Sequence, residues 1–97
     1  MTAHDIIATR LFGWQLTPNL WLADHTALTP FKWSSNKALP LLEERLNELG
    51  VMIGVVDIGL GHARVTLHNQ HTDVVYHATG YTEGDAVVMA VLQFLEP

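Results

Sequence analysis

The feature that most constrains this chain is a run of three β-prone segments in its C-terminal half. We expect strands over Val51–Ile58, His62–Asn69 and Thr72–Thr79, because each is rich in β-branched residues. Two short turn signals separate them, Gly59-Leu60-Gly61 and Gln70-His71. Connections this short join antiparallel neighbours, since parallel strands need a crossover of a dozen or more residues. This half of the chain therefore predicts an antiparallel meander.

Alternation of apolar and polar residues predicts which side chains share a face. Pairing the second and third strands about Gln70-His71 places Val65 opposite Tyr76. It also places Leu67 opposite Val74, which makes this face apolar. The first strand adds Val51, Ile53 and Val55 to this apolar face. Its other side carries Met52, Val56 and Ile58, so part of the second face of the sheet also needs cover.

The same pairing predicts a polar face. It places Arg64 opposite His77 and His68 opposite Asp73. Hydrogen-bond donors gathered on one sheet face suit a phosphate or carboxylate, especially when an arginine can bind two oxygens. Arg64, His68 and His77 are therefore candidate ligand-binding residues. Arg64 is equally able to pair with Asp57 or Asp73.

The N-terminal segment predicts a helix over Thr2–Phe12. Thr2 and Asp5 form a variant of the capping box, and Gly13 can take the left-handed conformation that ends a helix. Beyond it, β-prone runs lie on either side of Pro18-Asn19, a turn-forming dipeptide. We expect a small hairpin there.

A second helix is expected from about residue 39, with Ser34, Ser35 and Asn36 as candidate N-caps. Pro40 lacks an N–H and fits best in the first turn, and Gly50 ends the helix. The apolar stripe has helical spacing and consists of Leu39, Leu42, Leu46 and Leu49.

A third helix is expected over residues 83–96, opened by Thr82 and Asp85. It is apolar nearly all round, as in helices that are sandwiched in a core or used at a subunit contact. The complete order is α-β-β-α-β-β-β-α. This order predicts an α+β fold, a mainly antiparallel sheet with helices packed against it.

Length and composition limit the class of protein. Ninety-seven residues predict a single domain over residues 1–97, and 48% hydrophobic against 15% charged residues excludes a disordered chain. No apolar run approaches the roughly 20 residues that span a bilayer. The absence of cysteine and of a basic start followed by an apolar stretch favours a cytoplasmic protein without disulfides.

The charge pattern argues against binding bulk nucleic acid. The formal net charge is −5, and the five basic residues are scattered along the chain. Non-specific binding to a phosphate backbone depends on clustered Lys and Arg. A small anionic ligand is still compatible, because it needs only a local group of donors.

Several short motifs together resemble the phage ABA sandwich family. They are Phe12-Gly13-Trp14 after a short N-terminal helix, a Trp-containing hairpin, Pro30-Phe31, and Ser34-Ser35-Asn36 opening an amphipathic helix. The chain departs from the family pattern at Val87-Val88-Met89, where a more regular run of small residues is typical. The resemblance implies the family's fold and a phage origin. It transfers no catalytic residue, because the family has no settled function.

The segment LFGWQLTPNLWLADHTALTPFKW contains all three tryptophans of the chain. Trp14 directly follows the helix stop and is expected to pack in the core. Trp21, Phe31 and Trp33 are candidate ligand-binding residues, because an aromatic-rich irregular segment can stack a base or anchor a protein partner.

Neither metal nor catalytic chemistry has a recognisable motif here. Four histidines fall between His62 and His77, yet no HxH, HExxH or cysteine-containing ligand pattern accompanies them. No GxSxG elbow, Walker loop or GxGxxG follows a predicted strand. We expect no catalytic residues, no metal and no cofactor.

These observations favour a small, non-enzymatic, phage-type binding protein. We expect a host-defence antagonist that sequesters a nucleotide-like immune signal as a homo-oligomer. One alternative is an inhibitor or accessory factor whose aromatic segment docks on a host protein. Another is a metal-dependent enzyme. No membrane partner is expected.

Overall fold

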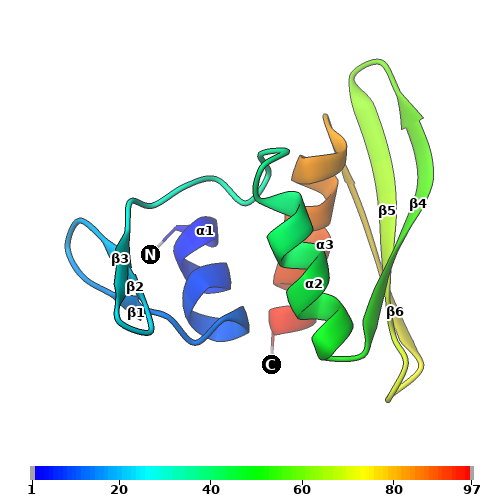
Figure 1. Cartoon of the computed structure of the whole chain (residues 1–97). Coiled ribbons are helices and arrows are strands. Elements are labelled where there is room, and N and C mark those ends of the chain that lie inside the picture. Colours follow the sequence, from blue (N-terminus) through cyan, green and yellow to red (C-terminus); the bar gives the residue numbers. More distant parts are fainter. Residues whose placement is uncertain (1, 97) are drawn as a thin grey trace.

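The computed structural model describes residues 2–96 and has an α+β fold (Figure 1). Two antiparallel three-stranded sheets lie on opposite sides of a layer of helices. The elements in chain order are α1 (Ala3–Ile6), η1 (Ile7–Leu11), β1 (Gln15–Leu16), β2 (Trp21–Ala23), β3 (Thr26–Leu28), α2 (Leu39–Glu48), β4 (Val51–Gly59), β5 (His62–Asn69), β6 (Val74–Gly80) and α3 (Glu83–Leu95).

The N-terminal sheet, β1–β3, corrects the predicted element order. The predicted hairpin about Pro18-Asn19 is present as the antiparallel pair of β1 and β2, and a third strand that was not predicted, β3, pairs with the other side of β2. Ala23 pairs with Thr26, so Asp24 and His25 form a two-residue turn in which Asp24 has a φ of 56°. Asp tolerates this conformation. The sequence reading missed the turn because Asp-His is a weaker hairpin signal than Asn-Gly.

The first helix begins as predicted and ends as predicted. Thr2 and Asp5 form a complete capping box, each side chain accepting from the other residue's backbone N–H. After Ile6 the helix widens into a π-helical turn, η1. Gly13 has a φ of 71°, which confirms the left-handed helix stop.

Helix α2 starts at Leu39 with Pro40 in its first turn, as expected. The predicted N-caps are wrong. Ala38 occupies the cap position, and Ser34, Ser35 and Asn36 lie in the preceding turns. Leu42 and Leu46 are fully buried, which confirms the core stripe of this helix.

The C-terminal sheet, β4–β6, has the predicted strand order but a different register between β5 and β6. Leu67 pairs with Tyr76 and Val65 with Ala78, two residues away from the expected partners. The cause is the connection, in which Asp73 takes a φ of 60° and donates its N–H to the carbonyl of Asn69 (2.8 Å). Four residues turn the chain instead of two. A shift of two keeps every side chain of β5 and β6 on its predicted face. In β4 the prediction for Ile58 is wrong, because the bulge between Val55 and Asp57 places Ile58 opposite Ala63, on the face that the helices cover.

Helix α3 is sandwiched rather than exposed. It packs against β5 and β6 on one side and against η1 on the other. This packing accounts for its nearly all-round apolar character, which we expected either for a buried helix or for a subunit contact. Its buried residues are Gly84, Ala86, Val87, Val88, Ala90 and Val91.

Helices α2 and α3 cover only one face of β4–β6 (Figure 1). Ala63, Val65 and Leu67 of β5 point into that layer and are buried. Arg64, with the opposite parity, is exposed. The other face, here called the open face, has no described helix or strand packed on it.

Candidate functional site

The open face carries the three polar residues that the sequence singled out, Arg64, His68 and His77, and His68 lies opposite Val75 rather than the expected Asp73. Arg64 lies opposite Thr79 across the β5–β6 ladder, and His77 lies opposite Thr66, one row away. The expected pairing of Arg64 with His77 is therefore wrong in register but right in face. Arg64 and His77 are diagonal neighbours across the two strands, a separation that long side chains can span.

Arg64 makes no ion pair or hydrogen bond with any side chain in residues 2–96. The two aspartates that were its candidate partners bind histidines instead. Asp57 Oδ2 lies 3.1 Å from His62 Nε2, and Asp73 Oδ1 lies 2.7 Å from His68 Nε2. The guanidinium therefore keeps its donors for solvent or a ligand, whereas the His68 imidazole already has a carboxylate partner.

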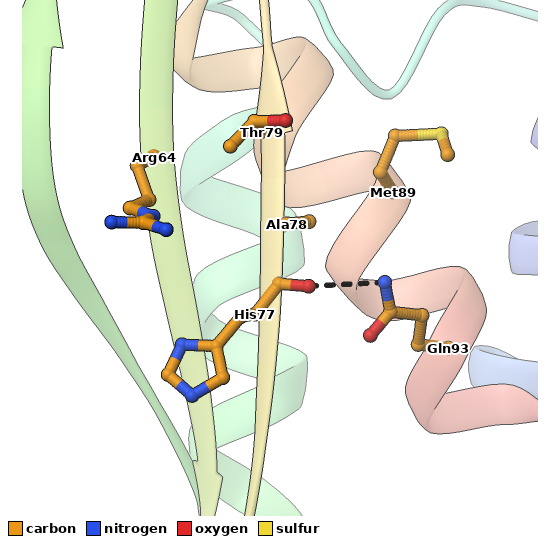
Figure 2. Close-up of a pocket in the computed structure, with 6 residues that line it drawn as sticks. All are labelled: Arg64, His77, Ala78, Thr79, Met89 and Gln93. Atoms are coloured by element: carbon orange, nitrogen blue, oxygen red, sulfur yellow. Dashed lines mark hydrogen bonds between the residues drawn. The ribbon is translucent and has the colours of Figure 1, made fainter.

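A hollow of about 360 Å³ lies astride β6, beside Arg64 (Figure 2). Arg64 and His77 lie on one side of the strand and the helix α3 side chains on the other. Gln93 Nε2 donates to the carbonyl oxygen of His77 (3.0 Å) and ties α3 to this strand. Thr79 was not predicted because its place opposite Arg64 depends on the four-residue turn, and Gln93 was not predicted because its contact joins α3 to a strand 16 residues earlier. The lining residues are Arg64, His77, Ala78, Thr79, Met89 and Gln93.

The predicted aromatic residues lie elsewhere, beside the N-terminal sheet. The rings of Trp21 and Trp33 are 1% and 0% exposed, with centroids 5.8 Å apart and planes nearly parallel. Trp14 and Phe31 pack against them, as expected of Trp14. Ligand stacking on Trp21 or Trp33 stays a prediction. Neither ring has an exposed face on which a ligand could stack in this structure. We name the group formed by Phe12, Trp14, Trp21, Phe31 and Trp33 the aromatic cluster.

Both buried indoles are anchored to the first helix by hydrogen bonds. Trp21 Nε1 donates to Asp5 Oδ1 (2.9 Å), and Trp33 Nε1 donates to the carbonyl of His4 (3.0 Å). The bond from Trp21, followed by those from Thr2, holds the pKa of the Asp5 carboxyl below its ordinary value. These contacts explain the burial of two large amphipathic rings.

A second hollow, of about 410 Å³, adjoins the aromatic cluster. It is lined in part by His4, Trp21, Phe31 and Lys32. The sequence reading missed His4 and Lys32 because no motif marks them. Asp5 also lines it, but both of its carboxylate oxygens already accept hydrogen bonds. The hollow offers the Lys32 ammonium and aromatic groups beside the N-terminal sheet, which lies across the helices from β4–β6 (Figure 1).

His4 makes the stability of this region depend on pH. Its Nδ1 accepts the backbone N–H of Trp33 (3.1 Å), which requires the neutral ring. Burial, followed by the charge of Lys32, lowers the pKa of His4 from 6.5, against the smaller raising effects of Asp5 and Asp85. The unfolded chain therefore binds this proton more readily than the folded chain. Stability attributable to His4 is present above pH 6.5 and is lost as pH falls through the folded pKa.

We expect His4→Asn to flatten the dependence of unfolding free energy on pH below 6.5. The asparagine oxygen replaces Nδ1 as an acceptor and does not titrate. Urea unfolding measured at a series of pH values checks this, with His25→Asn in the exposed β2–β3 turn as the control. An unchanged slope in His4→Asn would contradict the assignment.

Within residues 2–96, no three His, Cys, Asp or Glu side chains are placed to hold a metal ion together. Two histidines of the open face, His62 and His68, each pair with a single aspartate. Across the same residues, no helix is both long and apolar enough to cross a membrane.

Comparison with known proteins identifies the fold. No family model matches the chain, and neither does any curated protein. A 2.0 Å crystal structure of a phage protein from Bacillus cereus ATCC 14579 is similar, with a TM-score of 0.71 over 96% of this chain and 86% of that one. The sequence identity is 18%. The chain thus has the fold of a phage protein, and its resemblance to the ABA sandwich family stays a resemblance.

Proposed function

We propose that this chain is a small, non-enzymatic, phage-type protein that sequesters a phosphate-bearing, nucleotide-like signal of host defence. The binding surface in this proposal is the open face of β4–β6, and the protein acts there as a homo-oligomer in the host cytoplasm. The observation that carries the proposal is Arg64, an exposed guanidinium without a carboxylate partner among the described residues, beside His77 and Thr79.

The chemistry of these groups suits phosphate. A guanidinium binds two oxygens of one phosphate in a fixed fork, and an imidazole or hydroxyl adds a further donor. Thr66 and Thr79 lie in the two rows that hold His77 and Arg64. The ring of Tyr81, which follows β6 directly, is 80% exposed and is available for a base to stack on. A phage origin is supported by the fold shared with the Bacillus cereus protein.

Isothermal titration of the purified protein with cyclic and linear nucleotides tests the proposal. We expect Arg64→Gln to weaken nucleotide binding by about 10- to 100-fold, because a charge-assisted hydrogen bond contributes roughly 1.5–3 kcal/mol. The matched control is Arg10→Gln, which changes an exposed arginine of η1 that does not line this hollow. Its affinity should equal that of the wild type.

Recovery of the ligand separates sequestration from catalysis. Chromatography of the denatured complex should return the nucleotide unchanged. A chemically altered product would favour an enzyme instead. If no nucleotide in the panel binds, or if Arg64→Gln binds as tightly as Arg10→Gln, the proposed function is wrong.

The protein-docking alternative has less support. It assigned the contact to Trp21 and Trp33, and both rings are enclosed by the aromatic cluster. A host protein whose binding is lost in the Phe31→Ala variant but not in Arg64→Gln would favour docking, because Phe31 is the partly exposed member of the predicted aromatic set.

A further inference from the structure

The two edges of the C-terminal sheet differ in how they are protected. On the outer edge of β6, Gln93 of α3 occupies the carbonyl of His77. On the outer edge of β4, no strand of residues 2–96 is paired, and Figure 1 shows β4 at the margin of the molecule. An unpaired strand presents a row of backbone donors and acceptors to any further strand.

The β4 edge is also apolar. Aspartate 57 is its one charged residue, and the carboxylate of Asp57 is bound to His62. Proteins that keep such edges free usually place lysine or proline on them. The exposed hydrophobic residues of the strand and its turn are Met52 (53%), Val55 (47%), Val56 (57%), Ile58 (58%) and Leu60 (103%).

The direction of the backbone groups can be assigned. Gln70 donates its N–H to the carbonyl of Gly50 (2.9 Å). The backbone N–H and C=O groups of the even-numbered residues that follow Gly50 therefore point toward β5. Because the direction of the backbone N–H and C=O groups alternates along a strand, those of Val51, Ile53 and Val55 point away from β5, toward the outer edge. A bulge follows between Val55 and Asp57 and ends the regular edge there. The segment able to pair is therefore residues 51–55.

We propose that residues 51–55 pair antiparallel with the same segment of a second copy of this chain, about a two-fold axis at Ile53. Ile53 then lies opposite Ile53 of the second copy, and Val51 lies opposite Val55. On the open face, Met52 lies opposite Gly54. Its exposed side chain covers the position where Gly54 has none, and the same contact is repeated across the axis.

A second copy fits this edge better than an unrelated strand. The segment itself contains no charge, and the one carboxylate that lines the hollow beside Met52 and Ile53 is that of Glu43 on α2. Its small and large residues complement each other under the same symmetry. The pairing is also closed, because the two-fold axis uses the β4 edge of both copies and leaves only the two β6 edges, where Gln93 occupies the carbonyl of His77. The product is a dimer with a six-stranded sheet.

This inference rests on the homo-oligomer part of the proposed function and not on its ligand. It assigns the contact to β4 rather than to α3, whose apolar surface is buried within one chain. The nucleotide-binding role of Arg64 can fail without affecting it.

Light scattering coupled to size exclusion tests the pairing. We expect the wild type to have twice the mass of one chain and Val55→Pro to have the mass of one chain. The Val55 N–H faces outward, so proline there removes no hydrogen bond within the chain, and the preceding Gly54 has no Cβ to clash with the ring. Val55→Lys, a second variant, places a charge opposite Val51 of the second copy, on each side of the axis, without altering the backbone.

Circular dichroism confirms folding of both variants, and Met89→Lys on the exposed side of α3 is the control that should stay dimeric. Hydrogen exchange gives an independent readout, since the Ile53 amide should be protected in the wild type and exchange faster in Val55→Lys. A wild-type mass of one chain at millimolar concentration, or folded Val55 variants that keep the dimer mass, overturns the proposal. Titration of the same variants with nucleotide reports separately on Arg64.

Discussion

Replacement of Trp33 by alanine is expected to lower the free energy of unfolding by about 3–5 kcal/mol, the range for a buried Trp or Phe truncated to Ala. The Trp33 ring is 0% exposed and stacks on Phe12 with a centroid separation of 4.7 Å. Its Nε1 also satisfies the carbonyl of His4. The substitution therefore empties the centre of the aromatic cluster and leaves the His4 carbonyl with only the backbone N–H of Ile7 as a donor.

Two further variants separate the parts of this effect. Trp33→Phe keeps an aromatic ring but loses the N–H donor, and its loss should be smaller, about 1–3 kcal/mol. Tyr81→Ala removes an 80% exposed ring and should change stability by less than about 0.5 kcal/mol. Urea unfolding followed by far-ultraviolet circular dichroism measures all three. A Trp33→Ala loss no larger than that of Tyr81→Ala would contradict the assigned packing.

Gly84→Ala is expected to be the second strongly destabilising change, with a loss of about 2–3 kcal/mol. Alanine normally favours a helix over glycine by up to about 1 kcal/mol. Here the sign is reversed, because a Cβ on Gly84 would collide with the backbone carbonyl oxygen of Ser34. That neighbour is backbone, so either the start of α3 or the segment before α2 has to move.

Gly61→Ala is the matched control for steric collision. Gly61 has a φ of 73° and nothing within 4 Å of the added Cβ, so only backbone strain of about 1–2 kcal/mol is expected. Thermal unfolding of the two variants compares them directly. If Gly84→Ala were as stable as the wild type, the close approach of α3 to Ser34 would be wrong.

The parts of the fold that could be predicted follow from periodicity and capping. Alternation in His62–Asn69 assigned every residue of that strand to its face, and the helix boundaries at Thr2, Gly13 and Leu39 follow from cap and proline chemistry. Turn length was not predictable in the same way. Asn69 accepts the N–H of His71 on its side chain and that of Asp73 on its carbonyl, which stabilises a longer turn than the residues Gln70-His71 suggest.

The residue types of the candidate site could be predicted from the sequence, but the positions of those residues relative to one another could not. Residue types and parity placed Arg64 and His77 on one face, and the structure brings them to one hollow. The aromatic residues were different, because tryptophan has the same appearance in a sequence whether it binds a ligand or fills a core. The hydrogen bonds of Trp21 to Asp5 and of Trp33 to His4 decide in favour of the core, and both depend on contacts far apart in the chain.

The closeness of the three indoles has a spectroscopic consequence. Their centroids lie 5.6 to 6.1 Å apart, within a part of the chain that the helices separate from β4–β6 (Figure 1). Tryptophan emission therefore reports on one region only. A ligand bound on the open face should leave this emission unchanged. Tyr76, packed edge-on to Phe94 at 5.9 Å, reports on the other end. Unfolding curves recorded through tryptophan and through tyrosine coincide only if both ends of the protein melt as one cooperative unit.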